Sequence, residues 1–364
     1  MLPLQALLAF SAALSAHAGS TPSLTLQLQG AASVTDIDNF KVLALLVNTG
    51  WYTLKILNDP LSPLSTLPAN TFEIVNSEGS TANFTGIMAK YVPEVAAKAG
   101  AYTTLKPGES VTVEHDLSEA YNLTATGAGA YDIKARNVFY LVNEQNKVST
   151  FQAQVSGSSL KVHVNGRLAK ARSPGSSTAL STSSKLANST LLSKRANFNG
   201  CSDILKWNIG LATIKAHEYA VNAKAYLESM TTPSQRWTTW YGGWNLFRGY
   251  TVSYHFDFLR NNDFLSYSYD CTCTDKGVYA YVYPNDFGKV FLCGAFWNAP
   301  EAGTDSKPGT IIHEASHFWA NEDGTSDYAY GQGACKDLAR NDGDKAVRNA
   351  DTYEYFAENS PGLP

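Results

Sequence analysis

The sequence predicts two domains of different class: an all-β sandwich, followed by a mainly helical α+β domain with a small sheet. The 364-residue chain is long enough for two separate cores. All five cysteines lie after residue 200 and none precedes it, so the composition divides the chain in the same place. Apolar and polar residues alternate between about 19 and 165, whereas apolar residues at 305–320 recur at helical spacing.

The first eighteen residues predict a signal peptide. They form an apolar run, MLPLQALLAFSAALSAHA, which ends in the small-x-small pattern that signal peptidase recognises. The run is too short to span a bilayer, and no later run of the chain reaches 18 apolar residues. We therefore expect a secreted protein with no membrane anchor; the alternative is a buried N-terminal helix.

Residues 19–165 are expected to form the β-sandwich. Period-two alternation is clear at 24–28, 111–113, 151–155 and 160–164, and turn residues such as Lys106-Pro107-Gly108 separate these runs. The pattern predicts about seven antiparallel strands.

Residues 166–195 are expected to be a linker. They are rich in Ser, Thr, Lys and Arg, have few large apolar residues, and end in the dibasic pair Lys194-Arg195. We interpret 19–165 as a propeptide domain that is released by cleavage here, so that the processed protein starts at Ala196 or Asn197. Residues 196–364 contain 13 basic and 20 acidic residues, a net charge of −7, which disfavours nucleic acid and favours basic substrates.

A helix predicted over residues 305–320 contains the motif His-Glu-x-x-His. His313 and His317 are one turn apart on such a helix, so their imidazoles are spaced for a tetrahedral zinc ion. Glu314 lies beside the metal without binding it, where its carboxylate can take a proton from the water that the metal activates. The motif predicts a catalytic zinc site in the second domain.

A catalytic zinc needs a third protein ligand and an open position. A third histidine at the spacing of the longer zinc-protease motif is excluded, because positions 320 and 323 are Ala and Asp. The residues alone leave Asp327, which follows the Gly324 turn, and the later glutamates Glu354 and Glu358 as candidates.

The residues around this motif resemble the deuterolysin (aspzincin) family of zinc endopeptidases, and are most similar to its lysine-specific fungal members. The resemblance rests on His313-Glu314-x-x-His317 followed by Gly324-Thr325-x-Asp327-x-x-Tyr330-Gly331, and on segments such as Asp270-Cys271-Thr272-Cys273-Thr274 and Cys293-Gly294-Ala295-Phe296-Trp297. It runs from about Asn197 to the C-terminus, and more loosely through the propeptide. It implies a zincin-like catalytic domain over 196–364.

The resemblance also implies roles for individual residues. It makes His313, His317 and Asp327 the ligands of one Zn²⁺ per catalytic domain, Glu314 the general base, and Tyr330 the donor that stabilises the oxyanion. It implies cleavage on the N-terminal side of lysine.

Asp351 and Glu354 match the positions that bind the lysine of the substrate. Three residues apart on a helix, they share a face and can converge on one ammonium. The expected partners are therefore lysine-containing proteins and peptides, and the chain's own propeptide before activation; we expect a monomer.

The cysteines are expected to form two disulfides. Cys271 and Cys273 are too close in sequence to pair easily with each other, and the resemblance implies Cys201 with Cys271 and Cys273 with Cys293. Cys335 is then left as a buried free thiol on a helix.

Two other functions are compatible with the motif. One is a deuterolysin-like protease of broad specificity on the same fold. The other is a binding protein that a closed zinc site stabilises and that hydrolyses nothing.

Overall fold

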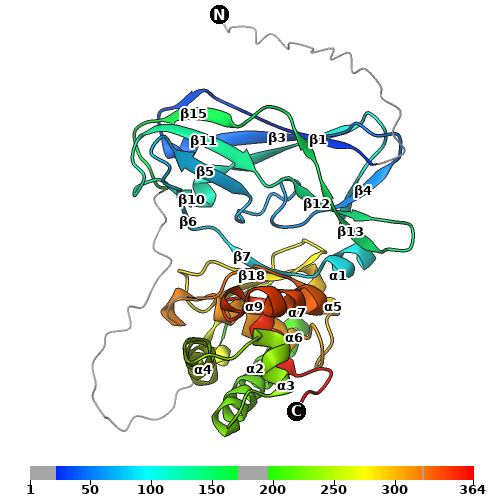
Figure 1. Cartoon of the computed structure of the whole chain (residues 1–364), viewed down its shortest axis with the longest axis vertical. Coiled ribbons are helices and arrows are strands. Elements are labelled where there is room, and N and C mark those ends of the chain that lie inside the picture. Colours follow the sequence, from blue (N-terminus) through cyan, green and yellow to red (C-terminus); the bar gives the residue numbers. More distant parts are fainter. Residues whose placement is uncertain (1–21, 171–195, 322–323) are drawn as a thin grey trace, which may run out of the picture.

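The structure, a computed structural model, describes residues 22–170, 196–321 and 324–364. An N-terminal β-rich region lies against a C-terminal region in which helices pack around a small sheet (Figure 1). The predicted signal peptide at 1–18 lies outside the described residues. So do residues 171–195 of the predicted linker, with the Lys194-Arg195 pair.

The N-terminal region is built almost entirely from strands. In chain order these are β1 (Leu24–Gly30), β2 (Ser33–Val34), β3 (Lys41–Asn48), β4 (Leu54–Leu57), β5 (Phe72–Asn76), β6 (Asn83–Phe84), β7 (Met88–Tyr91), β8 (Tyr102–Leu105), β9 (Ser110–Asp116), β10 (Tyr121–Asn122), β11 (Gly129–Ala135), β12 (Val138–Val142), β13 (Val148–Gln152), β14 (Gln154–Val155) and β15 (Leu160–Val164). Three short helical turns join them: η1 (Ile37–Asn39), α1 (Pro93–Lys98) and η2 (Leu117–Glu119).

Most of these strands form three four-stranded sheets, in the orders β14-β1-β3-β9, β2-β15-β11-β5 and β13-β12-β4-β8. Val42 of β3, Ile74 of β5 and Val162 of β15 lie in one apolar core that the first two sheets share. The β-rich character of this region is confirmed, but the expected number of about seven strands is too low. Residues 151–155, which alternate as one strand would, belong to β13 and β14 in different sheets, because the chain changes sheet at the buried Ala153.

The C-terminal region is mainly helical, with a small sheet, as predicted. Its helices are α2 (Asp203–Ser229), α3 (Gln235–Tyr241), α4 (Leu246–Asn261), η3 (Phe264–Ser266), α5 (Gly294–Asn298), α6 (Lys307–Ser316), η4 (Trp319–Asn321), α7 (Gly331–Asn341), α8 (Gly343–Ala346) and α9 (Ala350–Glu358). Its strands are β16 (Asn197–Asn199), β17 (Ser268–Asp270), β18 (Val278–Val282) and β19 (Lys289–Leu292). No helix in the described part of the chain is long and apolar enough to cross a membrane.

The fifth strand of the C-terminal sheet comes from the N-terminal region. The sheet order is β16-β17-β19-β18-β7, and β7 pairs antiparallel with β18, the outermost strand that the C-terminal region itself supplies on that side. Met88 lies opposite Val282, and Ala89 lies opposite Tyr281. In Figure 1, β7 and α1 lie between the two regions, next to β18. The two predicted domains are therefore joined by a main-chain ladder as well as by side chains.

Helix α6 is shorter than the helix predicted over 305–320. It begins after Ser306, whose hydroxyl accepts from the N–H of Gly309 at 3.0 Å, and it ends at Ser316 with His317 as the C-cap. The helix stops here because the following backbone bonds elsewhere: the N–H of Trp319 donates to Pro284, and the N–H of Thr325 donates back to Ser316. These bonds turn the chain after His317 back toward the helix.

Helix α6 crosses α9 at a glycine. A β-carbon at Gly309 would lie 2.1 Å from Oε1 of Glu358 and 2.9 Å from Oε1 of Glu354, so only glycine allows the two helices this close. Glu358 also accepts from the N–H and the hydroxyl of Ser306, at 2.8 and 2.7 Å. The carboxylates of α9 are therefore placed directly beside the first turn of α6.

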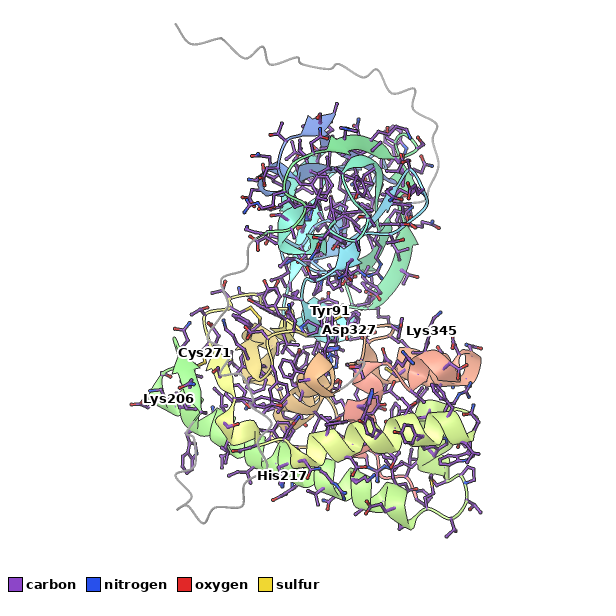
Figure 2. All side chains as sticks on the ribbon, turned by 90° about the vertical axis from the view of Figure 1, so that its left-hand side faces the viewer. Tyr91, Lys206, His217, Cys271, Asp327 and Lys345 are labelled. Carbon is purple, nitrogen blue, oxygen red and sulfur yellow. A yellow bond between two sulfur atoms is a disulfide. The ribbon has the colours of Figure 1, made fainter. Side chains whose placement is uncertain are left out.

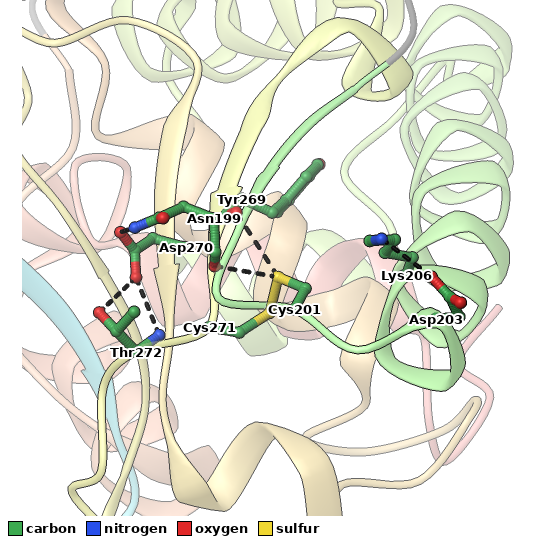
Figure 3. Close-up of a disulfide and its surroundings, with 8 residues drawn as sticks. All are labelled: Asn199, Cys201, Asp203, Lys206, Tyr269, Asp270, Cys271 and Thr272. Atoms are coloured by element: carbon green, nitrogen blue, oxygen red, sulfur yellow. Dashed lines mark hydrogen bonds and ion pairs between the residues drawn. A yellow bond between two sulfur atoms is a disulfide. The ribbon is translucent and has the colours of Figure 1, made fainter.

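Two disulfides, Cys201–Cys271 and Cys273–Cys293, have the predicted pairing. Figure 3 shows the first bridge beside Asp270, whose side chain accepts from the backbone and hydroxyl of Thr272. Cys335 is free and buried on α7, as expected.

Removing either disulfide should destabilise the C-terminal region. The bridges span 70 and 20 residues, so the chain-entropy model gives losses of about 4 and 3 kcal/mol in the free energy of unfolding for Cys201→Ala/Cys271→Ala and Cys273→Ala/Cys293→Ala. Denaturant unfolding followed by tryptophan fluorescence measures this, because six of the seven tryptophans lie after residue 196. Losses below about 1 kcal/mol for both pairs would contradict the expectation.

Candidate active site

Helix α6 and the residue after it present two imidazoles to one point. His313 lies in the last turn of α6, and His317 follows at the C-cap with helical backbone angles. Both side chains are fully buried, and the rings lie 4.9 Å apart, centre to centre. The Nε2 atom of each ring has no hydrogen-bond partner among the described residues. Two buried and unpaired nitrogens of this kind are suited to a metal ion.

The third atom at this point is Oδ1 of Asp327. It lies 3.3 Å from Nε2 of His313 and 3.4 Å from Nε2 of His317, and it also lacks a hydrogen-bond partner. Donors that bind one tetrahedral Zn²⁺ at about 2.0 to 2.2 Å lie about 3.3 Å apart, so the three atoms fit this ion. Gly324 permits the turn that brings Asp327 here, because a β-carbon would lie 2.3 Å from the carbonyl oxygen of His317.

Each imidazole is also fixed through its other nitrogen. Nδ1 of His313 lies 2.7 Å from Oδ1 of Asp351, and Nδ1 of His317 lies 3.0 Å from the carbonyl oxygen of Thr325. An oxygen beside Nδ1 favours the tautomer that carries the proton on Nδ1, which leaves Nε2 for a metal. Asp351 is held in turn by the N–H of Gly331, which donates to its Oδ2 at 2.7 Å.

Glu314 lies beside the three candidate ligands and does not join them. Its side chain is fully buried; Oε2 has no partner, and Oε1 accepts from the N–H of Lys90 at 3.0 Å. Burial raises the pKa of this carboxyl to about 7, although positive charge on His313 and His317 acts against the increase. A carboxyl in this range can both accept and release a proton.

Tyr330 places a buried phenol on the same side of the fold. It lies directly before α7, and its hydroxyl has no hydrogen-bond partner among the residues described. Its ring makes an edge contact with Tyr91, at 6.0 Å between ring centres. Figure 2 shows Tyr91 beside Asp327 at the junction of the two regions. A free phenol at this place can donate to an oxygen that gains negative charge.

A second polar cluster surrounds the ammonium of Lys90, a residue of β7. Nζ lies 2.7 Å from Oε2 of Glu354, 3.2 Å from Oδ1 of Asp305 and 3.5 Å from Oδ1 of Asp351. The lysine side chain is fully buried, as are those of Glu354 and Asp351. Asp351 and Glu354 therefore converge on the ammonium of Lys90, and their binding of a substrate lysine stays a prediction.

Two aromatic rings complete this lysine pocket, defined by Asp305, Asp351 and Glu354 with Tyr279 and Tyr355. The Lys90 ammonium lies 5.0 Å from the ring centre of Tyr279 and 5.4 Å from that of Tyr355. Both distances are within the range of cation–π attraction. The hydroxyl of Tyr355 also donates to Asp305 at 2.6 Å, which holds that carboxylate toward the pocket.

The charges in the lysine pocket depend on one another. Burial would lower the pKa of Lys90, but Asp351, Glu354 and Asp305 outweigh it and hold that pKa well above its usual value. Burial raises the pKa of Glu354 well above its usual value, although the ammonium acts against the increase. The pKa of Asp351 is lowered in spite of burial, because Lys90 and His313 favour its charged form. Without a cation, this pocket would hold buried negative charge.

Asp305 and Asn349 also shape the site, although neither is among the residues predicted from the sequence. The left-handed backbone of Asp305, φ 54°, gives no signal in the sequence. Asn349 holds the loop before Tyr330, because its side-chain oxygen accepts from the N–H groups of Tyr328 and Ala329, both at 2.9 Å. Its position two residues before Asp351 was the one available signal.

Of the three candidates for the third ligand, Asp327 alone reaches the two Nε2 atoms. Glu354 approaches Nδ1 of His313, on the other side of the ring, at 3.6 Å. His313, Asp351 and Glu354 would themselves form a set of metal-binding type, but the Lys90 ammonium occupies that place. Glu358 bonds Ser306 instead.

Known proteins that are similar to this chain include metallo-endopeptidases. Residues 226–358 match the aspzincin family model, described as lysine-specific metallo-endopeptidase. The chain is 44% identical to a peptidyl-Lys metalloendopeptidase of Grifola frondosa, over 98% of this chain and 97% of the relative. It is also 44% identical to a peptidyl-Lys metalloendopeptidase of Armillaria mellea, over 97% of this chain and 96% of the relative. A solved zinc peptidase from Grifola frondosa is 51% identical and covers 45% of this chain and all of its own, with a TM-score of 0.44.

The His313–Asp351 contact predicts a metal affinity that depends on a residue outside the ligand set. Asp351→Asn should weaken zinc binding by roughly 10- to 100-fold, because the amide cannot support the imidazole as a carboxylate does. Competition with a zinc-binding dye measures the change. Asp337→Asn is the matched control, since Asp337 is 63% exposed on α7 and pairs with Arg340 on the surface. Equal affinities for the two variants would contradict the expectation.

Proposed function

Because the chain belongs to the family of lysine-specific metallo-endopeptidases, we propose that it is the precursor of a secreted zinc endopeptidase that cuts on the N-terminal side of lysine. The observation that supports this proposal most directly is that the imidazole of His313 contacts both the candidate metal point and the lysine pocket. His313 directs Nε2 to the candidate metal point and Nδ1 to Asp351 of the lysine pocket. A lysine bound in the pocket therefore brings its own backbone next to Glu314.

His313, His317 and Asp327 are the proposed zinc ligands, for one ion per catalytic domain. Bound there, zinc supplies a Lewis acid that makes water more acidic and polarises the scissile carbonyl. Glu314 accepts the proton of the attacking water and then delivers it to the leaving amine. The Tyr330 hydroxyl donates a hydrogen bond to the oxyanion. One such donor typically stabilises the transition state by about 2.7 to 4 kcal/mol.

The specificity for lysine is proposed to come from Asp305, Asp351 and Glu354. Three carboxylates and two aromatic rings match a compact ammonium, and buried carboxylates left without a partner reject an apolar side chain. Glu354 makes the shortest contact to the ammonium, 2.7 Å against 3.2 and 3.5 Å, and it does not touch the proposed ligands as closely as Asp351 does. Changing specificity at Glu354 should therefore affect the metal less than changing it at Asp351.

We also propose that residues 196–364 form the catalytic region and that cleavage after Lys194-Arg195 releases it. The apolar leader at 1–18 supports export, and the dibasic pair supports processing. A binding protein with no catalysis is not retained, because the family is one of peptidases and because Glu314 and Tyr330 keep unpaired buried oxygens beside the ligand set.

A digest of a mixed protein substrate by the processed enzyme, with and without chelator, tests the function. Almost all new N-termini should be lysine, and chelation should abolish cleavage while the fold persists. Mixed new N-termini would favour the broad-specificity alternative. Unaltered cleavage under chelation would contradict a catalytic metal.

Glu314→Gln should lower kcat by several orders of magnitude and leave zinc bound, because glutamine cannot accept the proton of water. Peptide hydrolysis measures kcat, and the zinc content of the same sample shows whether the metal is still bound. A variant that keeps more than about a tenth of the activity would exclude Glu314 as the general base.

Glu354→Gln should lower kcat/KM for lysine peptides roughly 10- to 100-fold, since a charge-assisted hydrogen bond contributes roughly 1.5 to 3 kcal/mol. Glu218→Gln, on the surface of α2, is the matched control because Glu218 is 51% exposed and pairs with Lys215. Equal kcat/KM for lysine peptides in the two variants would contradict the proposed role of Glu354.

A further inference from the structure

The strand β7 contacts the proposed catalytic groups through its backbone. The N–H of Ala89 donates to Oδ2 of Asp327, and the N–H of Lys90 donates to Oε1 of Glu314, both at 3.0 Å. The peptide bond between Ala89 and Lys90 therefore lies directly between a proposed zinc ligand and the proposed general base. The nitrogen of Lys90 is within reach of the carboxylate that is proposed to protonate a leaving amine.

The strand is held as an extended peptide along the sheet edge. It pairs antiparallel with β18 from Met88 opposite Val282 to Tyr91 opposite Val278. Addition of a strand to an exposed edge is a general way to bind a peptide, in which the main chain gives affinity and alternate side chains give specificity.

The side chain of Lys90 supplies the specific contact. It is fully buried, it carries the ammonium at the centre of the lysine pocket, and Glu354 lies 2.7 Å from it. Arg136 of the N-terminal region pairs instead with Asp59, so it does not compete for the pocket.

Flanking residues fix this strand in register. Tyr91 is fully buried against Tyr330, and Val92 packs with Tyr279 and Ala295 of the C-terminal region. Ala89 and Tyr91 belong to one apolar cluster with Val278 and Cys293, so the two regions share a core at this point. A shift by one residue would remove Lys90 from the pocket and expose these apolar groups.

We propose that β7 is a built-in lysine peptide, which occupies the substrate cleft with Ala89 and Lys90 on the two sides of the reacting bond and so keeps the precursor latent. This inference rests on the proposed function, since it names the regulation of the same site. A substrate lysine and Lys90 require the same pocket, and the substrate backbone and β7 require the same edge of β18. The enzyme becomes active only when this strand leaves.

The test uses the full-length precursor with Glu314→Gln, so that no bond is cut, and compares it with the same chain carrying Lys90→Met. The probes are a dansylated hexapeptide with one lysine and its norleucine counterpart. Methionine keeps the length of the side chain but leaves the carboxylates of the pocket without a cation. Lys134→Met is the matched control, because Lys134 is 61% exposed and pairs with Glu73 on the surface.

Lys90→Met should increase affinity for the lysine peptide at least tenfold and affinity for the norleucine peptide less, because norleucine can use the freed edge of β18 but brings no cation to the carboxylates. It should also accelerate hydrogen exchange of residues 278–282 at least tenfold, whereas Lys134→Met should do neither. Unchanged exchange of β1 and β3 shows that the N-terminal region is still folded; if it is not, the comparison is made with Lys90→Gln.

Two results would overturn the inference: equal exchange at 278–282 in the parent and in Lys90→Met, or a parent that binds the lysine peptide as tightly as Lys90→Met does. The exchange measurement does not depend on catalysis. If exchange responds to Lys90→Met but the processed enzyme does not cut at lysine, the proposed function fails while the docking of β7 stands.

Discussion

The contact between His313 and Asp351 is the constraint on which the other features of the site depend. One imidazole points Nε2 at the candidate metal point and Nδ1, at 2.7 Å, at a carboxylate that also lies 3.5 Å from the Lys90 ammonium. The distance between the metal and the lysine pocket is therefore fixed by a single ring. This requires α6 and α9 to approach closely, and the absence of a side chain at Gly309 permits that approach.

The latency that we propose for the full-length chain follows from the same electrostatics. A pocket of buried carboxylates is suited to lysine, but it is also a source of instability whenever no cation fills it. Lys90 supplies that cation, and the edge of β18, which would otherwise have unpaired backbone groups, receives β7. The docking of Lys90 and β7 therefore accounts both for the inhibition that we propose and for the stability of the full-length chain.

Much of this could be predicted from the sequence, because it is local or carried by a specific motif. Spacing and family resemblance were enough to predict the cysteine pairs. They were also enough to select the two histidines, the glutamate between them and Asp327 as candidate site residues. Asp305 and Lys90 were missed because their roles arise from contacts over a long sequence separation. Lys90 lies more than 200 residues before the carboxylates it meets, in a strand whose partner belongs to the other region. The helix end at Ser316 was missed because backbone contacts with Pro284 and Thr325 decide it.

A crystal structure of the full-length precursor, with anomalous data at the zinc edge, tests the central claim most directly. The account predicts one zinc peak bounded by Nε2 of His313, Nε2 of His317 and Oδ1 of Asp327, with the Lys90 ammonium next to Glu354. A zinc ion bound by Glu354, or a lysine pocket from which β7 is absent, would contradict it.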